Sequence, residues 1–172
     1  MIWVAAFIAC VFGANWAIQT FGFVPVGFGL MAPAGVYFAG LTFTFRDLAH
    51  ERVGRGWVIV AIIIGAALSA LVSPTFAIAS GVAFLLSEMA DLAVYSPLRR
   101  RNWLGAVAAS NTVGLVIDSA LFLWLAFGSL EFLTGQVVGK AWMTVLAVII
   151  LGGVRALSQR RRQAGTASDG YA

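Results

Sequence analysis

Charged side chains are scarce in this sequence, and so are the residues that most metal and nucleophile chemistry requires. Of 172 residues, 10% are charged and 61% are hydrophobic, with one histidine and one cysteine. Soluble domains carry about 25% charged residues, so this composition argues against a water-soluble fold. The single cysteine, Cys10, excludes an intramolecular disulfide. The single histidine, His50, leaves no His/Cys set for a zinc site and no H-E-x-x-H protease motif.

Long apolar runs dominate the chain instead. They recur at about 20 residues each, the length that crosses a hydrocarbon layer about 30 Å thick. Hydropathy and helix-breaking residues predict an all-α polytopic membrane domain over residues 1–156 and a polar, disordered cytoplasmic tail over residues 157–172. The predicted helices cover residues 2–20, 30–49, 57–73, 75–95, 103–127 and 132–155. Pro33 is expected either to open the second helix or to kink it.

Arginines occupy alternate connections between these six transmembrane helices. "AHERVGRG" and "SPLRRRN" carry arginines, as does the tail, whereas "FGFVPVG", "SPT" and "GSLEFLTG" contain no lysine or arginine. The positive-inside bias therefore predicts that both termini are cytoplasmic and that the protein is a multi-pass protein of the plasma membrane. The net charge of +4 is explained by these membrane-edge arginines, so lipid and not nucleic acid is the expected contact.

Six charged residues lie within the predicted membrane spans: Arg46, Asp47, Glu88, Asp91, Asp118 and Lys140. A charge at mid-membrane costs about 2.5–3.5 kcal/mol on insertion scales, so such residues face the bundle interior or a cavity and are commonly functional. Arg46 and Asp47 form a charge cluster at the end of the second helix. Four acids and two bases leave two carboxylates unbalanced, which favours protonation or a cationic or donor-rich ligand. Structural ion pairs, such as Lys140 with Asp118 or Glu88, are the simpler alternative.

Helical spacing groups these residues with other polar side chains. Four stripes result: Glu88, Asp91 and Tyr95; Asn111 and Asp118; Gln136, Lys140 and Thr144; Asn15 and Gln19. The simplest packing directs all four to one central site. The expected substrate-binding residues are Asn15, Glu88, Asp91, Asn111, Asp118 and Lys140. Asp91 and Asp118 could also form an intramembrane protease, but its supporting sequence and a G-x-S-x-G motif are absent, so no enzyme, metal or cofactor is expected.

Four segments resemble, in order and spacing, the VUT family of queuosine precursor transporters: "GANWAIQTFG", "FRDLAHERVG", "SEMADLAVYSPLRRRNWLGAVAASNTVGLVIDSALFLWLAFGS" and "GKAWMTVLAVIILGGV". The resemblance covers about residues 10 to 155. It implies a six-helix importer of 7-cyano-7-deazaguanine and 7-aminomethyl-7-deazaguanine in the bacterial inner membrane. The positions that match the family's motifs are Asn15, Asp47, Gly54, Asp91, Asp118 and Lys140.

The polar stripes suit that class of ligand. A guanine-like edge offers N–H donors to a carboxylate and an oxygen acceptor to Asn, Gln or Lys, and charged partners strengthen such hydrogen bonds. Stacking on the flat ring is expected from Trp16, Phe43, Tyr95 or Trp142.

An alternative function is a substrate-binding membrane subunit energised by a separate ATPase module. The first helix carries a ridge of small residues, Ala5, Ala9, Gly13 and Ala17, which lets another helix approach closely. Packing within the bundle and docking of a partner both explain this ridge. A homodimer or an ATPase module is the expected protein partner.

Overall fold

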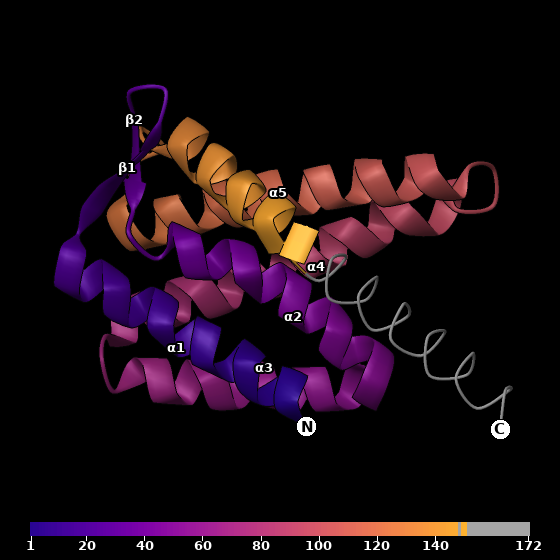
Figure 1. The fold of residues 1–172 in the computed structure, drawn as a ribbon, viewed down its shortest axis with the longest axis horizontal. Helices are drawn as coiled ribbons and strands as arrows, with labels where there is room; N and C mark the ends of the chain where they lie inside the picture. Colours follow the sequence, from indigo (N-terminus) through magenta and orange to yellow (C-terminus); the bar gives the residue numbers. More distant parts are fainter. Residues whose placement is uncertain (148, 151–172) are drawn as a thin grey trace, which may run out of the picture.

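The computed structural model, which describes residues 1–147, 149 and 150, is a bundle of helices with one small β-hairpin (Figure 1). Its elements are α1 (Ile2–Phe21), β1 (Phe23–Gly27), β2 (Leu30–Pro33), α2 (Val36–Val53), α3 (Arg55–Ala70), α4 (Pro74–Leu98) and α5 (Trp103–Phe127). A further helix covers residues 133–147. The tail predicted for residues 157–172 lies outside the described residues.

The two longest labelled helices begin at capping residues and pack against each other as a helical hairpin (Figure 1). Ser73 caps α4 by accepting a hydrogen bond from the Phe76 amide at 3.3 Å, and Pro74 follows as the first helical residue. Asn102 caps α5 by accepting from the Gly105 amide at 3.0 Å. Each cap satisfies an amide that has no partner within its helix. The bounds predicted for the fifth helix are confirmed.

The second helix begins at Val36 and not at residue 30, because residues 30–33 form a strand. Strands β1 and β2 pair antiparallel, with Val24 opposite Ala32. The turn between them contains Gly27 and Gly29 at φ values of 96° and 73°, which glycine adopts without steric cost. Pro33 therefore ends β2 and neither opens nor kinks a helix, so the prediction for Pro33 was wrong. The all-α prediction misses this hairpin.

The hairpin is held against α2 and the helix over residues 133–147. The Tyr37 hydroxyl donates a hydrogen bond to the Pro25 carbonyl oxygen at 2.6 Å. Three apolar side chains form a small buried cluster between hairpin and helix: Val26, Ala32 and Val36. A Cβ added to Gly139 would lie 2.7 Å from Val36 Cγ2, so the last helix approaches this cluster closely. The hairpin thus covers one end of the bundle.

The bundle has an apolar outside and polar groups in its interior, the reverse of a soluble protein. Large apolar side chains such as Ile63, Ile78 and Trp124 are exposed, whereas Gln136 and Lys140 are buried. Three described helical segments are long and apolar enough to cross a membrane: Ile2–Phe21, Pro74–Leu98 and Ala108–Phe127. The apolar stretch Gly56–Ala70 is shorter. The chain is a helical membrane protein; six crossings and cytoplasmic termini stay predictions.

Candidate functional site

The predicted site residues, apart from Glu88, line two cavities between the helices. Glu88 lines neither cavity and pairs with Arg46. The first, which we call the Lys140 cavity, has a volume of about 70 Å³ and is lined by residues from α1 to α5 and from the helix over residues 133–147. Its polar lining is Asn15, Thr42, Ser80, Asp118, Gln136 and Lys140. The second, the Arg46 cavity, has a volume of about 650 Å³ and is lined by α2, α4, α5 and the last helix. Its charged lining is Arg46, Asp47, Glu51 and Asp91.

Lys140 and Asp118 form a buried ion pair in the smaller cavity. Lys140 is 2% exposed, and its Nζ donates to Asp118 Oδ2 at 2.5 Å and to Ser119 Oγ at 3.0 Å. Two ions buried in a medium of low dielectric are stable only when they pair closely and their remaining groups are hydrogen-bonded. Because one positive and one negative charge balance, the lining of the Lys140 cavity has no net charge.

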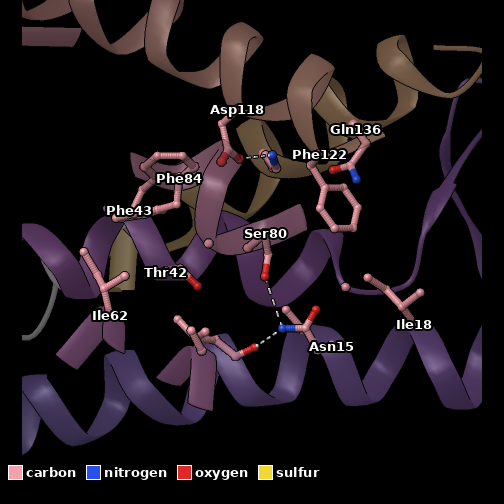
Figure 2. Close-up of a pocket in the computed structure, with 17 residues that line it drawn as sticks. Asn15, Ile18, Thr42, Phe43, Ile62, Ser80, Phe84, Asp118, Phe122 and Gln136 are labelled. Carbon is pink, nitrogen blue, oxygen red and sulfur yellow. Dashed lines mark hydrogen bonds and ion pairs between the residues drawn. The ribbon is translucent and has the colours of Figure 1, made fainter. Parts of the chain in front are cut away.

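Two amide side chains enter the same cavity from different helices. Figure 2 shows Asn15 on α1 at one side of the cavity and Asp118 and Gln136 at the other. Asn15 Nδ2 donates to the Val11 carbonyl oxygen at 3.2 Å and to Ser80 Oγ at 3.4 Å. Within the described residues, Asn15 Oδ1 and Gln136 Oε1 have no hydrogen-bond partner. The cavity therefore presents two buried acceptors.

Aromatic rings form the apolar wall of the Lys140 cavity. Phe43 and Phe84 stack with ring centroids 5.9 Å apart and planes at 30°, and Phe122 adds a third ring (Figure 2). Phe43 lines both cavities, and the Arg46 guanidinium carbon lies 5.6 Å from its ring centroid. The two cavities therefore share this ring as part of their walls.

Of the four rings predicted to stack on a ligand, Phe43 lines the Lys140 cavity. Trp16 and Trp142 are exposed, and Tyr95 lies beside Arg99.

Arg46 carries the ion pairs of the larger cavity. It pairs with Asp47 at 2.7 Å and with Glu88, while the Asp47 side chain is 60% exposed. Asp91 lines this cavity and has no ion-pair partner within the described residues. The excess of carboxylates that the sequence predicts thus lies with Arg46 and not with Lys140.

The structure divides the predicted single site into two. Asn15, Asp118 and Lys140 line the smaller cavity, whereas Asp91 and Asn111 line the larger one. Asn111 and Asp118 lie on one helix, but seven residues correspond to about 10.5 Å along the helix axis. Two residues on the same helical face can therefore lie at different positions along the helix axis. Asp91 and Asp118, the aspartates considered for a protease, line separate cavities.

The substrate-binding residues expected from the sequence did not include Gln136, Thr42 or Ser80. Gln136 belongs to the polar stripe of Lys140, four residues away on one helical face, but it was not among the expected binding residues. Thr42 and Ser80 are single small polar residues in apolar helices, for which the sequence offers no comparable signal. Among the described residues, no group of three His, Cys, Asp or Glu side chains could hold a metal ion.

Comparison with known proteins gives one family match. Residues 70–154, about half of the chain, match the family model described as "Putative vitamin uptake transporter". The match includes α4, α5 and the helix over residues 133–147, and with them Asp118, Gln136 and Lys140. No curated protein and no solved structure matches the chain significantly. The matched region agrees with the resemblance seen in the sequence, and the chain belongs to the VUT family of membrane transporters.

Proposed function

We propose that this chain imports the queuosine precursors 7-cyano-7-deazaguanine and 7-aminomethyl-7-deazaguanine across the bacterial inner membrane, and that the base binds in the Lys140 cavity. The family match supports uptake of a small organic molecule, and the four resembling sequence segments support the deazaguanine class. The observation that carries the proposal is a cavity with apolar walls and a buried, charge-balanced set of polar groups, inside a bundle whose outer surface is apolar.

The lining of this cavity suits a small flat base. Phe43, Phe84 and Phe122 offer ring faces for stacking. The Asp118 carboxylate and the amide oxygens can accept from N–H groups, and Lys140 can donate to a ring carbonyl oxygen.

The test is uptake of labelled 7-cyano-7-deazaguanine into bacterial cells that lack their own route for it. Asp118→Asn and Lys140→Ala are expected to reduce uptake to background at unchanged membrane expression, because each breaks the buried pair. Glu131→Gln is the matched control, since Glu131 is an exposed acid outside the lining of both cavities. Normal uptake by both cavity variants would show that the base binds elsewhere.

A second candidate is a substrate-binding membrane subunit that an ATPase module energises. Only part of the small-residue ridge of α1 packs against other helices of the chain. A Cβ added to Gly13 would lie 2.9 Å from the Phe38 ring, and Ala17 is buried, whereas Ala5 and Ala9 are exposed. This exposed half is a possible docking face for a helix of a partner.

Reconstitution of the purified chain alone in liposomes separates the two candidates. An importer moves labelled base into the vesicle lumen without any other protein. A subunit that needs an ATPase binds the base and leaves the lumen empty.

A further inference from the structure

We infer that Asn15 and Gln136 determine the specificity of the Lys140 cavity, and that their side-chain carbonyl oxygens accept hydrogen bonds from two N–H donors of the bound base. The inference rests on the proposed function, because it names the groups that would recognise the base in that cavity. It assigns a role to Gln136, which matches none of the motif positions of the family resemblance.

Burial is the first observation. Asn15 is 1% exposed and Gln136 is 2% exposed, and both line the Lys140 cavity. Their oxygens, Asn15 Oδ1 and Gln136 Oε1, have no hydrogen-bond partner among the described residues. About 90% or more of buried polar groups in proteins are hydrogen-bonded, so two unpartnered acceptors in one cavity indicate donors supplied from outside the chain.

The hydrogen bonds around Asn15 fix the direction of its amide. Its Nδ2 donates to the Val11 carbonyl oxygen, which can only accept, so the nitrogen cannot exchange places with the oxygen. Ser80 Oγ accepts from the same nitrogen and uses its own proton on the Ala77 carbonyl oxygen at 3.2 Å. The Ser80 hydroxyl therefore cannot donate to Asn15 Oδ1, which stays an acceptor.

Most other donors of the cavity are engaged within the chain. Two of the three Lys140 N–H groups donate to Asp118 and Ser119, and the Thr42 hydroxyl donates to the Phe38 carbonyl oxygen at 2.9 Å. A ligand that fits the lining therefore supplies N–H donors to the two amide oxygens and a carbonyl oxygen to the third N–H group of Lys140. A guanine-like base has two such donors on one edge, the ring N1–H and the exocyclic 2-amine. An adenine-like base replaces the ring donor with an acceptor.

The experiment measures binding of two ligands to the purified full-length chain in detergent by calorimetry. The ligands are 7-cyano-7-deazaguanine and the analogue that lacks the 2-amine but keeps N1–H. Loss of one buried hydrogen bond that leaves its partner unsatisfied corresponds to about ten- to hundredfold in affinity. We expect the wild-type chain to prefer the amine-bearing base by a factor in this range.

The variants are Asn15→Leu and Gln136→Met, and the matched control is Gln19→Met, which removes an exposed amide of α1 outside the cavity. The variant that loses the amine contact is expected to lose the preference for the amine-bearing base, because the 2-amine then has no acceptor in the cavity. The other is expected to bind both about tenfold more weakly, because both ligands carry N1–H. Variants that keep the wild-type affinity and preference would overturn the inference.

Thermal unfolding distinguishes recognition from a structural role. Gln136→Met removes a buried acceptor that has no partner among the described residues, so the ligand-free variant is expected to unfold at or above the wild-type temperature. Its ligand-induced stabilisation is expected to shrink. A lower ligand-free midpoint with an unchanged ligand shift would assign Gln136 a structural role and overturn the inference.

The same data separate the inference from the proposed function. If the wild-type chain binds neither ligand, both fail. If it binds and the two variants behave like Gln19→Met, only the inference fails.

Discussion

The Lys140 cavity and the Arg46 cavity share the Phe43 ring, but they stabilise their charges differently. In the smaller cavity Lys140 and Asp118 pair one to one, and Lys140 is 2% exposed. In the larger cavity several acids surround Arg46, and the Asp47 side chain is 60% exposed. Ion pairs therefore occur both in a buried and in a partly exposed environment.

This difference explains which groups can select a ligand in each cavity. Two charges buried together are strongly coupled, and neither can be removed without leaving the other unpaired. Near the surface, water screens each charge, so an ion pair contributes little to stability. We therefore expect the neutral amides of Asn15 and Gln136 to provide the selectivity of the Lys140 cavity. The comparison predicts that breaking an ion pair lowers the free energy of unfolding much more at Lys140 than at Arg46.

The largest expected effect comes from breaking the buried pair on one side. Lys140→Met leaves the Asp118 carboxylate buried without a partner and is expected to lower the free energy of unfolding by about 3–5 kcal/mol. The double variant Lys140→Met/Asp118→Leu removes both charges and is expected to regain most of that loss while uptake stays absent. Chemical unfolding in detergent measures both values. If the single variant is as stable as the wild type, Asp118 is not left as an unpaired buried charge.

An intermediate effect is expected where α2 meets the last helix. A Cβ at Gly40 would lie 2.6 Å from Met143 Cβ and 2.8 Å from the Lys140 carbonyl oxygen. Gly40→Ala should therefore push the helices apart and lower the free energy of unfolding by about 1–3 kcal/mol. Gly56→Ala is the control, because its added Cβ meets nothing within 4 Å. Equal stability of the two variants would show that this close contact is unimportant.

The smallest effect is expected at the ion pairs of Arg46. Glu88→Gln removes one of the two acids paired with Arg46, and Asp47 continues to pair with it. Because Glu88 is partly exposed, the loss in unfolding free energy is expected to be about 0–1 kcal/mol. The same unfolding assay measures it. A loss as large as that of Lys140→Met would remove the contrast between the cavities.

The helices could be predicted from the sequence more readily than the hairpin. Residues 103–127 combine an Asn cap with a long apolar run, and both signals are local. The segment "FGFVPVGFGLMAP" is apolar throughout and shows no strand-like alternation, so hydropathy alone assigns part of it to a helix. Gly27 and Gly29 mark the turn, but the pairing of β1 with β2 depends on how α2 packs.

For the cavity linings, the sequence indicated the types of polar residue more readily than their positions. Helical periodicity places Asn111 and Asp118 on one face, and Gln136 and Lys140 on another. Helical periodicity does not predict how neighbouring helices align along their axes. It therefore cannot separate the Lys140 cavity from the Arg46 cavity. That separation depends on the tertiary packing that places Phe43 between them.

The shared ring has a practical consequence for mutagenesis. Phe43→Ala would remove a ring that lines both cavities and, with it, the aromatic face next to the Arg46 guanidinium. Defects in such a variant would mix lost ligand stacking with altered access and a displaced arginine. Phe43 is therefore the position at which a single alanine-scan value is least interpretable, and milder changes such as Phe43→Leu should be compared before any role is assigned to it.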